Sequence, residues 1–490
     1  KCPKPPSTTI ATIITDSIKL NDSGDTKPWK AANMAPDGQM TAQTLAPNVY
    51  DAEPIPDAAR AEIDRLLSSG DLFRYTAAEG APVALLEQEF ADLLGAKYAL
   101  AVASCSAALF LSLKALDLPR GARVLIPAFT FAAVPSAVVH ADCTPVLVEV
   151  GDNYRVDMAD FAAKIDDAQA VIISHMRGHT SDMDAIMALC DARNIPVVED
   201  AAHSLGTQWH GRNIGTIGKI GCFSFQSYKL VNAGEGGILI TDDPELAARC
   251  VIMSGAYESN WKKHPGMQNS YMLWQNKLPL YNMRMQNLSA AVIRPQLPEV
   301  ASRVAKGRAG HDRVADQLNT SAYLAVPPAL APEDRAPDSI QFNLTGDWTD
   351  TEALRFQSEA KKRGITVQVF GLSDGNARAF WNWEFLGPAP ELPQTRAMLM
   401  RACDVRLPTR LTEAEAVAAL GADVAKALSA CAVRGTTVVA VRTEIKSLAD
   451  APADTHDAYL RLHLLSHRLV QPHGANVTGI FGLLANVAWT

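Results

Sequence analysis

The sequence predicts an α/β protein in which a large domain with a mostly parallel sheet precedes a smaller α+β domain. Between residues 56 and 241, short continuous runs of β-branched and other apolar residues alternate with helical patterns. That alternation is typical of a parallel sheet covered by helices on both faces. After about residue 320 the pattern changes, because the separated strands "IQFNLTG" and "ITVQVFG" follow a polar helical stretch.

The elements of the large domain follow from the spacing of apolar residues. In the helical patterns these residues recur three or four positions apart, and two of the patterns stop at a glycine, which commonly ends a helix. The expected helices cover residues 56–70, 82–95, 107–116 and 181–194. The expected strands cover residues 97–103, 123–127, 145–150, 170–174, 195–200, 219–225 and 236–241. Ligands of such sheets bind beyond the carboxyl ends of the strands.

The smaller domain is expected after a polar helix at residues 303–319. Its strands are predicted at 340–346 and 365–371, followed by a helix at 412–428. Thr412 opens that helix, and Glu415 three residues later completes a capping box. The predicted organisation is a disordered leader or fragment edge (1–45), a large domain (46–310), a small domain (311–430) and an appended segment (431–490).

Composition narrows the class of protein. A chain of 490 residues has room for roughly three domains. Its net charge of -8 gives no electrostatic reason to expect a nucleic acid or an anionic membrane as partner, and no apolar stretch approaches the length of a membrane span. The cysteines show no CxxC pair and no metal-like spacing, so no metal site is expected. Several lie in or beside apolar runs, which favours buried free thiols in a reducing cytoplasm: Cys105, Cys143, Cys190, Cys222 and Cys250.

The first candidate site residues lie where the strand at 97–103 turns into a helix. Ser104, Cys105, Ser106 and Ala107 are all small. Free backbone amides and the helix dipole at such a point suit a phosphate. Taken alone, an ordinary tight turn is the simpler explanation.

Two further strands also end in candidate site residues. Phe131 follows "IPAFT", where an aromatic ring either stacks on a flat ligand or packs in the core. Glu199, Asp200 and His203 come at or just beyond the end of a wholly apolar strand. A carboxylate there either caps a helix or holds a protonated ring nitrogen.

The stretch "GCFSFQSYKLVNAGEGG" carries Lys229 out of a buried strand into a glycine-rich turn, with Ser224 five residues before it. Pyridoxal 5'-phosphate requires a lysine for its Schiff base, a carboxylate beside its ring nitrogen, a phosphate cradle and a ring to stack on. A lysine amine in a partly desolvated pocket loses its proton more easily and becomes a usable nucleophile. No single feature is specific, but together they predict this cofactor.

The segment "EDAAHSLGTQWHGRNIGTIGKIGCFSFQSYKLVNAGEGGILIT" resembles the signature region of the DegT/DnrJ/StrS-type aminotransferases. The resemblance continues through "LGAKYALAVASCSAALFLSLKAL", "IPAFTFAAVPSAV", "DMDAIMAL" and "YNMRMQNLSAA", and covers about residues 50–430. It implies the type I fold of pyridoxal-phosphate transferases, with the cofactor between the two domains. It also implies action largely on keto-sugars and keto-cyclitols.

The resemblance implies a role for each matching residue. Lys229 matches the lysine of the Schiff base, and Asp200 matches the partner of the pyridine nitrogen. Asn282, in "YNMR", matches an asparagine that reaches the cofactor phosphate of the neighbouring subunit, so a homodimer with a shared active site is expected. The remaining matches are the stacking Phe131, the phosphate-binding Ser106, Ala107 and Ser224, and His203 near the ring hydroxyl of the cofactor.

The chain departs from the family pattern in two places. The phosphate turn reads "CSAA" where many members have Gly-Thr-Ala-Ala, and "SHMRGHTSD" stands where many have "HLYG". The second change introduces Arg177 and His179 as candidate substrate-binding residues. The guanidinium either binds a carboxylate or phosphate of a substrate, or forms a surface ion pair with Asp182 or Asp184.

The last residues do not follow the aminotransferase pattern. Residues 434–490 resemble part of the N-terminal region of the actinobacterial tetrahydrodipicolinate N-succinyltransferase. The resemblance ends before the repeats that carry the acyl-transfer site of that family, so no succinyltransferase activity is expected. His463 and His467 lie one helical turn apart, but without a third ligand an amphipathic packing helix explains them better than zinc.

The sequence thus predicts an aminotransferase that moves an amino group from Glu or Gln to a keto-sugar, keto-cyclitol or related carbonyl acceptor through Lys229. A dehydratase related to the family is an alternative, although those enzymes have His in place of the lysine. The second alternative is a non-catalytic or regulatory protein that keeps the fold.

Overall fold

The computed structural model of the protein describes residues 55–78, 80–362 and 365–407. The chain divides into two compact units, Lys1–Thr44 and Leu45–Thr490, and all described residues belong to the second. The expected leader, the helix expected at 412–428 with its capping box, and the appended segment therefore lie outside the described part.

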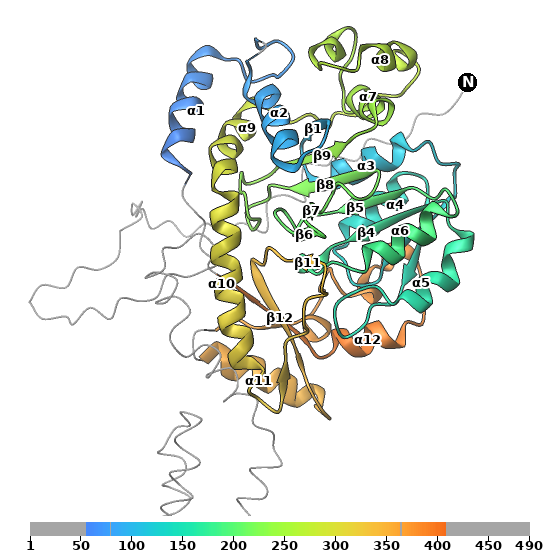
Figure 1. Cartoon of the computed structure of the whole chain (residues 1–490), viewed down its shortest axis with the longest axis vertical. Coiled ribbons are helices and arrows are strands. Elements are labelled where there is room, and N and C mark those ends of the chain that lie inside the picture. Colours follow the sequence, from blue (N-terminus) through green and yellow to red (C-terminus); the bar gives the residue numbers. More distant parts are fainter. Residues whose placement is uncertain (1–54, 79, 363–364, 408–490) are drawn as a thin grey trace, which may run out of the picture. The chain divides into compact units, whose positions relative to one another are not determined.

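A seven-stranded sheet forms the centre of this unit, with strand order β1-β9-β8-β5-β4-β2-β3 (Figure 1). Neighbouring strands are parallel except where β9 pairs with β1 and with β8. The mostly parallel sheet predicted from the sequence is confirmed. Its strands are β1 Tyr98–Val102, β2 Arg123–Pro127, β3 Thr144–Val148, β4 Ala170–Ser174, β5 Val197–Asp200, β8 Ile220–Ser224 and β9 Gly237–Thr241.

Both faces of this sheet are buried, which is why its strands are continuous apolar runs. Alternate side chains of one strand enter different clusters: Val124 and Ile126 of β2 lie in one core, and Leu125 lies in the other. Four of the covering helices lie between strands in sequence, two precede the first strand and one follows the last. Those of the first part of the chain are α1 Asp57–Ser69, α2 Pro82–Leu94, α3 Cys105–Ala115, α4 Ala133–His140, α5 Met158–Lys164, α6 Met183–Asp191 and α7 Pro244–Met253.

Three further helices lead from the large sheet to the second sheet. They are α8 Gln268–Trp274, α9 Asn287–Ile293 and the long α10 Val300–Leu318. The polar helix expected at 303–319 is therefore confirmed. Short 3-10 turns occur at Ile165–Asp167, Met176–Gly178, Asn260–Lys263, Arg294–Glu299, Phe370–Leu372, Phe380–Asn382 and Glu384–Leu386.

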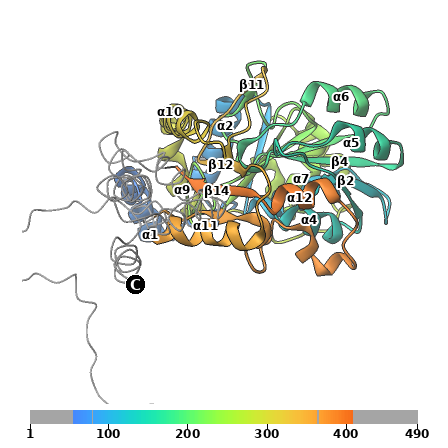
Figure 2. The ribbon, with the colours of Figure 1, turned by 90° about the horizontal axis from the view of Figure 1, so that it is seen from below.

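The second sheet is antiparallel and has the order β10-β12-β14-β13. Side chains of α10 and α11 pack against it in a third core. Figure 2 shows the ribbon of these elements from below. The strand expected at 340–346 is present as β12, whereas only two residues of the strand expected at 365–371 are extended, because a 3-10 turn begins at Phe370. The elements are β10 Leu324–Ala325, β12 Ser339–Leu344, α11 Asp350–Lys362, β13 Gln368–Val369, α12 Pro393–Leu399 and β14 Ala402–Arg406.

A small third sheet, β11-β6-β7, connects the segment before β12 to the loop after β5. Its strands are β6 Gln208–Trp209, β7 Arg212–Asn213 and β11 Glu333–Asp334. The α/β fold class is confirmed, while the domain boundaries at 46–310 and 311–430 stay predictions.

Candidate active site

A cleft of about 750 Å³ lies at the carboxyl ends of the parallel strands. Residues at or after the ends of β1, β2, β4, β5 and β8 line it, together with residues of β13, β14 and the loop at Arg378. The sequence-predicted residues that it brings together are Ser106, Phe131, Arg177, Asp200, His203, Ser224 and Lys229. Strand topology therefore gathers residues that are more than a hundred positions apart in the sequence.

Lys229 lies in the loop after β8, and its amine contacts a histidine. Lys229 Nζ is 2.8 Å from His203 Nε2 and 3.3 Å from Nδ1. Burial lowers the pKa of the Lys229 amine from 10.5 to about 8, with Arg177 acting in the same direction and Asp338 and Asp200 opposing it. Burial and the neighbouring Lys229 also hold the pKa of His203 well below 6.5. A neutral imidazole therefore faces an amine that deprotonates near neutral pH.

Asp200 ends β5 and presents a buried carboxylate to the same cleft. Its Oδ2 accepts a hydrogen bond of 2.7 Å from Ser174 Oγ, and Ser174 Oγ accepts one of 2.8 Å from Thr130 Oγ1. The Oδ1 atom accepts from the backbone amide of Ala202 at 3.2 Å. Sequence reasoning missed Ser174 and Thr130, although Ser174 ends the predicted strand at 170–174. These bonds fix the direction of the carboxylate.

Glu199, which precedes Asp200, does not line this cleft. Successive residues of a strand point to opposite faces, and the Glu199 carboxylate accepts from the amides of Gly215, Ile217 and Gly218 at 2.6–2.8 Å. His175 Nε2 lies 3.1 Å from its Oε2. Burial acts to raise the pKa of Glu199, but these hydrogen bonds outweigh it and hold the pKa below its ordinary value. Glu199 therefore anchors the loop before β8.

The turn into α3 was expected to offer free backbone amides. Ser104 caps the helix by accepting a hydrogen bond of 3.1 Å from the amide of Ala107, so that amide already has a partner within the chain. Ser106 lines the cleft, whereas Ala107 lines an adjoining depression that Phe131 also borders. A Cβ atom at Gly237 would lie 2.2 Å from the carbonyl carbon of Ser104. This close approach of β9 to the turn explains one glycine of the stretch around Lys229.

Phe131 is 45% exposed, so the alternative that it packs in the core is wrong. The guanidinium carbon of Arg378 lies 5.8 Å from the centre of its ring. At the end of β8, Ser224 Oγ accepts a hydrogen bond of 3.3 Å from the amide of Gln226.

Arg177 lines the cleft, but it does not form the surface ion pair that the sequence left open. Its side chain is buried, and its guanidinium lies 2.8 Å from Asp404 on β14. Its backbone has φ 56, a left-handed conformation that is uncommon for residues other than glycine. Asp182 instead caps α6, and Asp184 binds Trp209 and His210.

His179 was predicted to bind substrate, and the structure corrects this. It does not line the cleft: its side chain is fully enclosed, with Nε2 at 2.8 Å from Gln341 Oε1 and Nδ1 at 2.9 Å from a nitrogen of Arg335. Burial and Arg335 hold the pKa of His179 well below 6.5. Gln341 in turn donates to Asp404 at 2.7 Å. His179 thus stabilises the Arg177–Asp404 ion pair indirectly, through Gln341.

Asn282 is exposed in the loop before α9 and does not line the cleft. The structure of one chain therefore places it apart from Lys229. The expected thiols Cys105, Cys143, Cys190, Cys222 and Cys250 are buried and free, as is Cys403.

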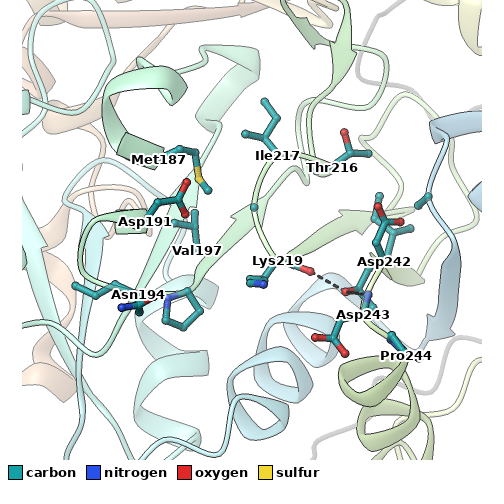
Figure 3. A pocket seen from close by; sticks show the side chains of 17 residues that line it. Met187, Asp191, Asn194, Val197, Thr216, Ile217, Lys219, Asp242, Asp243 and Pro244 are labelled. Carbon is teal, nitrogen blue, oxygen red and sulfur yellow. Dashed lines mark hydrogen bonds between the residues drawn. The ribbon is translucent and has the colours of Figure 1, made fainter. Parts of the chain in front are cut away.

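A second cavity of about 820 Å³ lies at the opposite edge of the sheet, where β5 and β8 begin (Figure 3). Lys219, Asp242 and Asp243 border it, and the backbone carbonyl of Lys219 accepts a hydrogen bond of 2.7 Å from Thr241. It brings no nucleophile beside a buried acid, so the cleft at Lys229 is the candidate active site. Within the described ranges, no helix is long and apolar enough to cross a membrane, and no cluster of three metal-ligating side chains occurs.

Comparisons with known proteins agree with this site. The sequence profile of the DegT/DnrJ/EryC1/StrS aminotransferase family matches residues 58–421. Spore coat polysaccharide biosynthesis protein SpsC of Bacillus subtilis is 34% identical over 55% of this chain and 68% of its own length. UDP-N-acetyl-3-dehydro-α-D-glucosamine 3-aminotransferase of Acidithiobacillus ferrooxidans is 36% identical over 44% of this chain and 56% of its own length. The chain thus spans between 56% and 68% of these two relatives.

A solved structure supports the same assignment. The aminotransferase from Psychrobacter cryohalolentis superposes with a TM-score of 0.64 and 27% identity, and covers 76% of this chain and 98% of its own. The findings do not support the expected resemblance of residues 434–490 to a succinyltransferase, and these residues lie outside the described part. Since the family match extends over well more than half of the sequence, the chain belongs to the DegT/DnrJ/EryC1/StrS aminotransferase family.

Proposed function

We propose that this protein moves an amino group from Glu or Gln to a keto-sugar, keto-cyclitol or related carbonyl acceptor. One observation carries the proposal: an amine whose pKa is lowered to about 8 shares a cleft with the buried carboxylate of Asp200. The cofactor of the family is pyridoxal 5'-phosphate, as the sequence predicted. The relatives support a keto-sugar acceptor, because one of them is named for a 3-dehydro-glucosamine derivative.

The residues of the cleft fit this cofactor. When bound, pyridoxal 5'-phosphate supplies an aldehyde that bonds to amines and a ring that withdraws electrons from the attached carbon. The oriented carboxylate of Asp200 fits a protonated ring nitrogen, and the exposed ring of Phe131 fits a stacking partner. Ser106, Ser224 and the capped turn at the start of α3 offer hydroxyl and amide donors suited to a phosphate.

Lys229 has two tasks in the proposed mechanism. Its neutral amine would hold the cofactor covalently and, when free, would take up and return a proton at Nζ. His203 lies 2.8 Å from Nζ and is neutral, so it accepts a hydrogen bond from the protonated amine without adding positive charge. Ser174 and Thr130 keep the Asp200 carboxylate aligned, and this carboxylate would hold the ring nitrogen of a bound cofactor protonated.

We further propose a cytoplasmic homodimer. Asn282 is exposed and lies outside the cleft of its own subunit, which suits a residue that serves the cleft of a neighbour. Sedimentation of the wild-type protein and of Asn282→Ala, with cofactor content measured in parallel, tests this. A monomer with full cofactor content contradicts it.

Borohydride reduction of the cofactor-loaded protein, followed by peptide mapping, tests the central proposal. The pyridoxyl adduct is expected on Lys229, and Lys229→Ala is expected to lose both the adduct and the violet absorbance band. Lys219→Ala is the matched control, because Lys219 lies at the opposite end of β8 beside the second cavity. An adduct on another lysine contradicts the proposal.

The same protein separates the alternatives. Addition of Glu or Gln is expected to bleach the band, and a keto-sugar is expected to restore it. An absorbance band that stays unchanged on addition of every amino donor tested indicates a non-catalytic protein. Loss of water from the substrate without net amino transfer indicates a dehydratase, although the lysine at position 229 disfavours it.

A further inference from the structure

Two arginines that line the cleft remain unexplained by cofactor binding. Arg378 lies in the loop after β13, and Arg406 ends β14; both line the cleft that contains Lys229. Within the part of the chain that the structure describes, neither forms an ion pair with a carboxylate, and the Nε atom of each is buried without a hydrogen-bond partner. Two guanidinium groups thus border the cleft, and each has an N–H donor without an acceptor.

Two of the three acids that line the cleft already have other partners. Asp404 is held between Arg177 at 2.8 Å and the Gln341 amide at 2.7 Å. Asp200 faces Ser174 and the site proposed for the cofactor ring. The third acid of the lining, Glu235, is exposed. Two guanidinium groups of the cleft lining are therefore left without a carboxylate partner among the described residues.

Both arginines are held in place by neighbouring rings. The guanidinium carbon of Arg378 lies 5.8 Å from the centre of the Phe131 ring and 5.9 Å from that of Phe370. Arg406 lies 5.2 Å from the Tyr228 ring and donates to the Tyr228 carbonyl at 3.2 Å. Burial, followed by the charge of Arg177, lowers the pKa of Arg378 to about 10. Such restrained and partly desolvated cations gain most from an anionic ligand.

Because one lysine serves both half-reactions, donor and acceptor occupy the same cleft in turn. The carboxylate of a Glu or Gln donor would satisfy the guanidinium groups in the first half-reaction. A neutral acceptor would leave them unpaired in the second, and a site built for a charged group discriminates against ligands that lack it. We propose, on the basis of the function proposed above, that Arg378 and Arg406 form a carboxylate subsite and that the natural acceptor is an acidic keto-sugar.

Arg177 has a different part in this arrangement. Its guanidinium already pairs with Asp404, which in turn is bonded through Gln341 to His179. It is a positioning residue that fixes β14 beside the cleft. Arg378 and Arg406 bind the ligand.

Calorimetry on the cofactor-loaded protein, without an amino donor, tests the subsite. The ligands are non-reacting pairs that differ only in a carboxylate: glucuronate and glucose, and galacturonate and galactose. UDP is a third arm. The variants are Arg378→Gln, Arg406→Gln and the charge-preserving Arg378→Lys, with the surface variant Arg193→Gln as control, because Arg193 pairs with exposed Asp166 outside the cleft. Thermal unfolding and the absorbance band of each variant report folding and cofactor content.

We expect at least one sugar acid to bind wild type roughly 10- to 100-fold more tightly than its neutral counterpart. Each Gln variant is expected to lose most of that preference, Arg378→Lys to retain part of it, and Arg193→Gln to retain all of it. Equal binding of acids and neutral sugars by wild type overturns the proposal, as does a preference that survives in both Gln variants. Tighter binding of UDP that depends on the same arginines also overturns it, because the anion is then a diphosphate. Because this binding experiment contains no amino donor, a negative result rules out the carboxylate subsite only. The proposed aminotransferase activity is tested independently by the donor-dependent bleaching of the absorbance band.

Discussion

The lowered pKa of Lys229 leads to a measurable prediction for the cofactor-free protein. The pKa falls from 10.5 to about 8, mainly through burial. At pH 7 this raises the neutral fraction of the amine roughly 300-fold over that of an ordinary lysine. Because only the neutral amine is nucleophilic, Lys229 is expected to react with a limiting amount of acetic anhydride far faster than its exposure alone would give.

Two substitutions move this pKa in opposite directions. The carboxylate of Asp338 raises the pKa of Lys229, so Asp338→Asn is expected to shift the labelling midpoint below pH 8. Arg177 lowers the pKa, so Arg177→Gln is expected to shift the midpoint upward. If burial alone lowered the pKa, both variants would have the same labelling midpoint as the wild type.

Competitive labelling between pH 6 and 11, with mass spectrometry of the Lys229 peptide, measures these midpoints. The exposed Lys97 in the same digest serves as the internal reference for reagent concentration. A wild-type midpoint above pH 10 refutes the reasoning, and so does an upward shift in Asp338→Asn. The first result would mean that water reaches the amine and that the cleft does not desolvate it, and the second that the Asp338 carboxylate does not raise the pKa of the amine.

Three further predictions concern the supports of the cleft. Ser174→Ala removes the 2.7 Å hydrogen bond to Asp200 and is expected to weaken cofactor binding by roughly tenfold, measured by fluorescence titration at unchanged melting temperature. Gly237→Ala places a Cβ 2.2 Å from the Ser104 backbone and is expected to lower the free energy of unfolding in urea by about 1–3 kcal/mol; an unchanged value contradicts the close approach. Glu199→Gln is expected to cost about 2–3 kcal/mol at pH 7. Because the native pKa of Glu199 is lowered, its contribution is present above the unfolded pKa near 4.5 and disappears as pH falls through the native value, so the variant should lose less stability on acidification.

Glu199 and Asp200 are adjacent acids with different roles, because one binds a loop and the other lines the cleft. The strand directs one side chain to each face of the sheet. Glu199 meets three amides of the loop before β8 on one face, and Asp200 meets Ser174 at the edge of the cleft. The pair of acids was visible in the sequence. Which of them faced the cleft depended on the register of β5 against β8 and β4.

The candidate site was predictable where it depends on strand ends. Parallel strands place their carboxyl ends at one edge, so the positions of Lys229, Asp200, Phe131 and Ser106 followed from local patterns and from the family resemblance. The Schiff-base, stacking and phosphate-binding roles assigned to them stay predictions that the experiments above test. His179 was misjudged because its spacing from Arg177 gives no information about burial, and its partner Gln341 lies more than 160 residues away.

The sequence by itself determined the alternation of strands and helices, the mostly parallel sheet and the lysine-bearing loop after β8, because apolar periodicity and helix-ending glycines act over a few neighbouring residues. Only the tertiary structure decided that Arg177 pairs with Asp404 and that Arg378 and Arg406 face the same space as Lys229. Those contacts join the two sheets across the cleft, between segments more than 140 residues apart, and their energies depend on desolvation that no local pattern records.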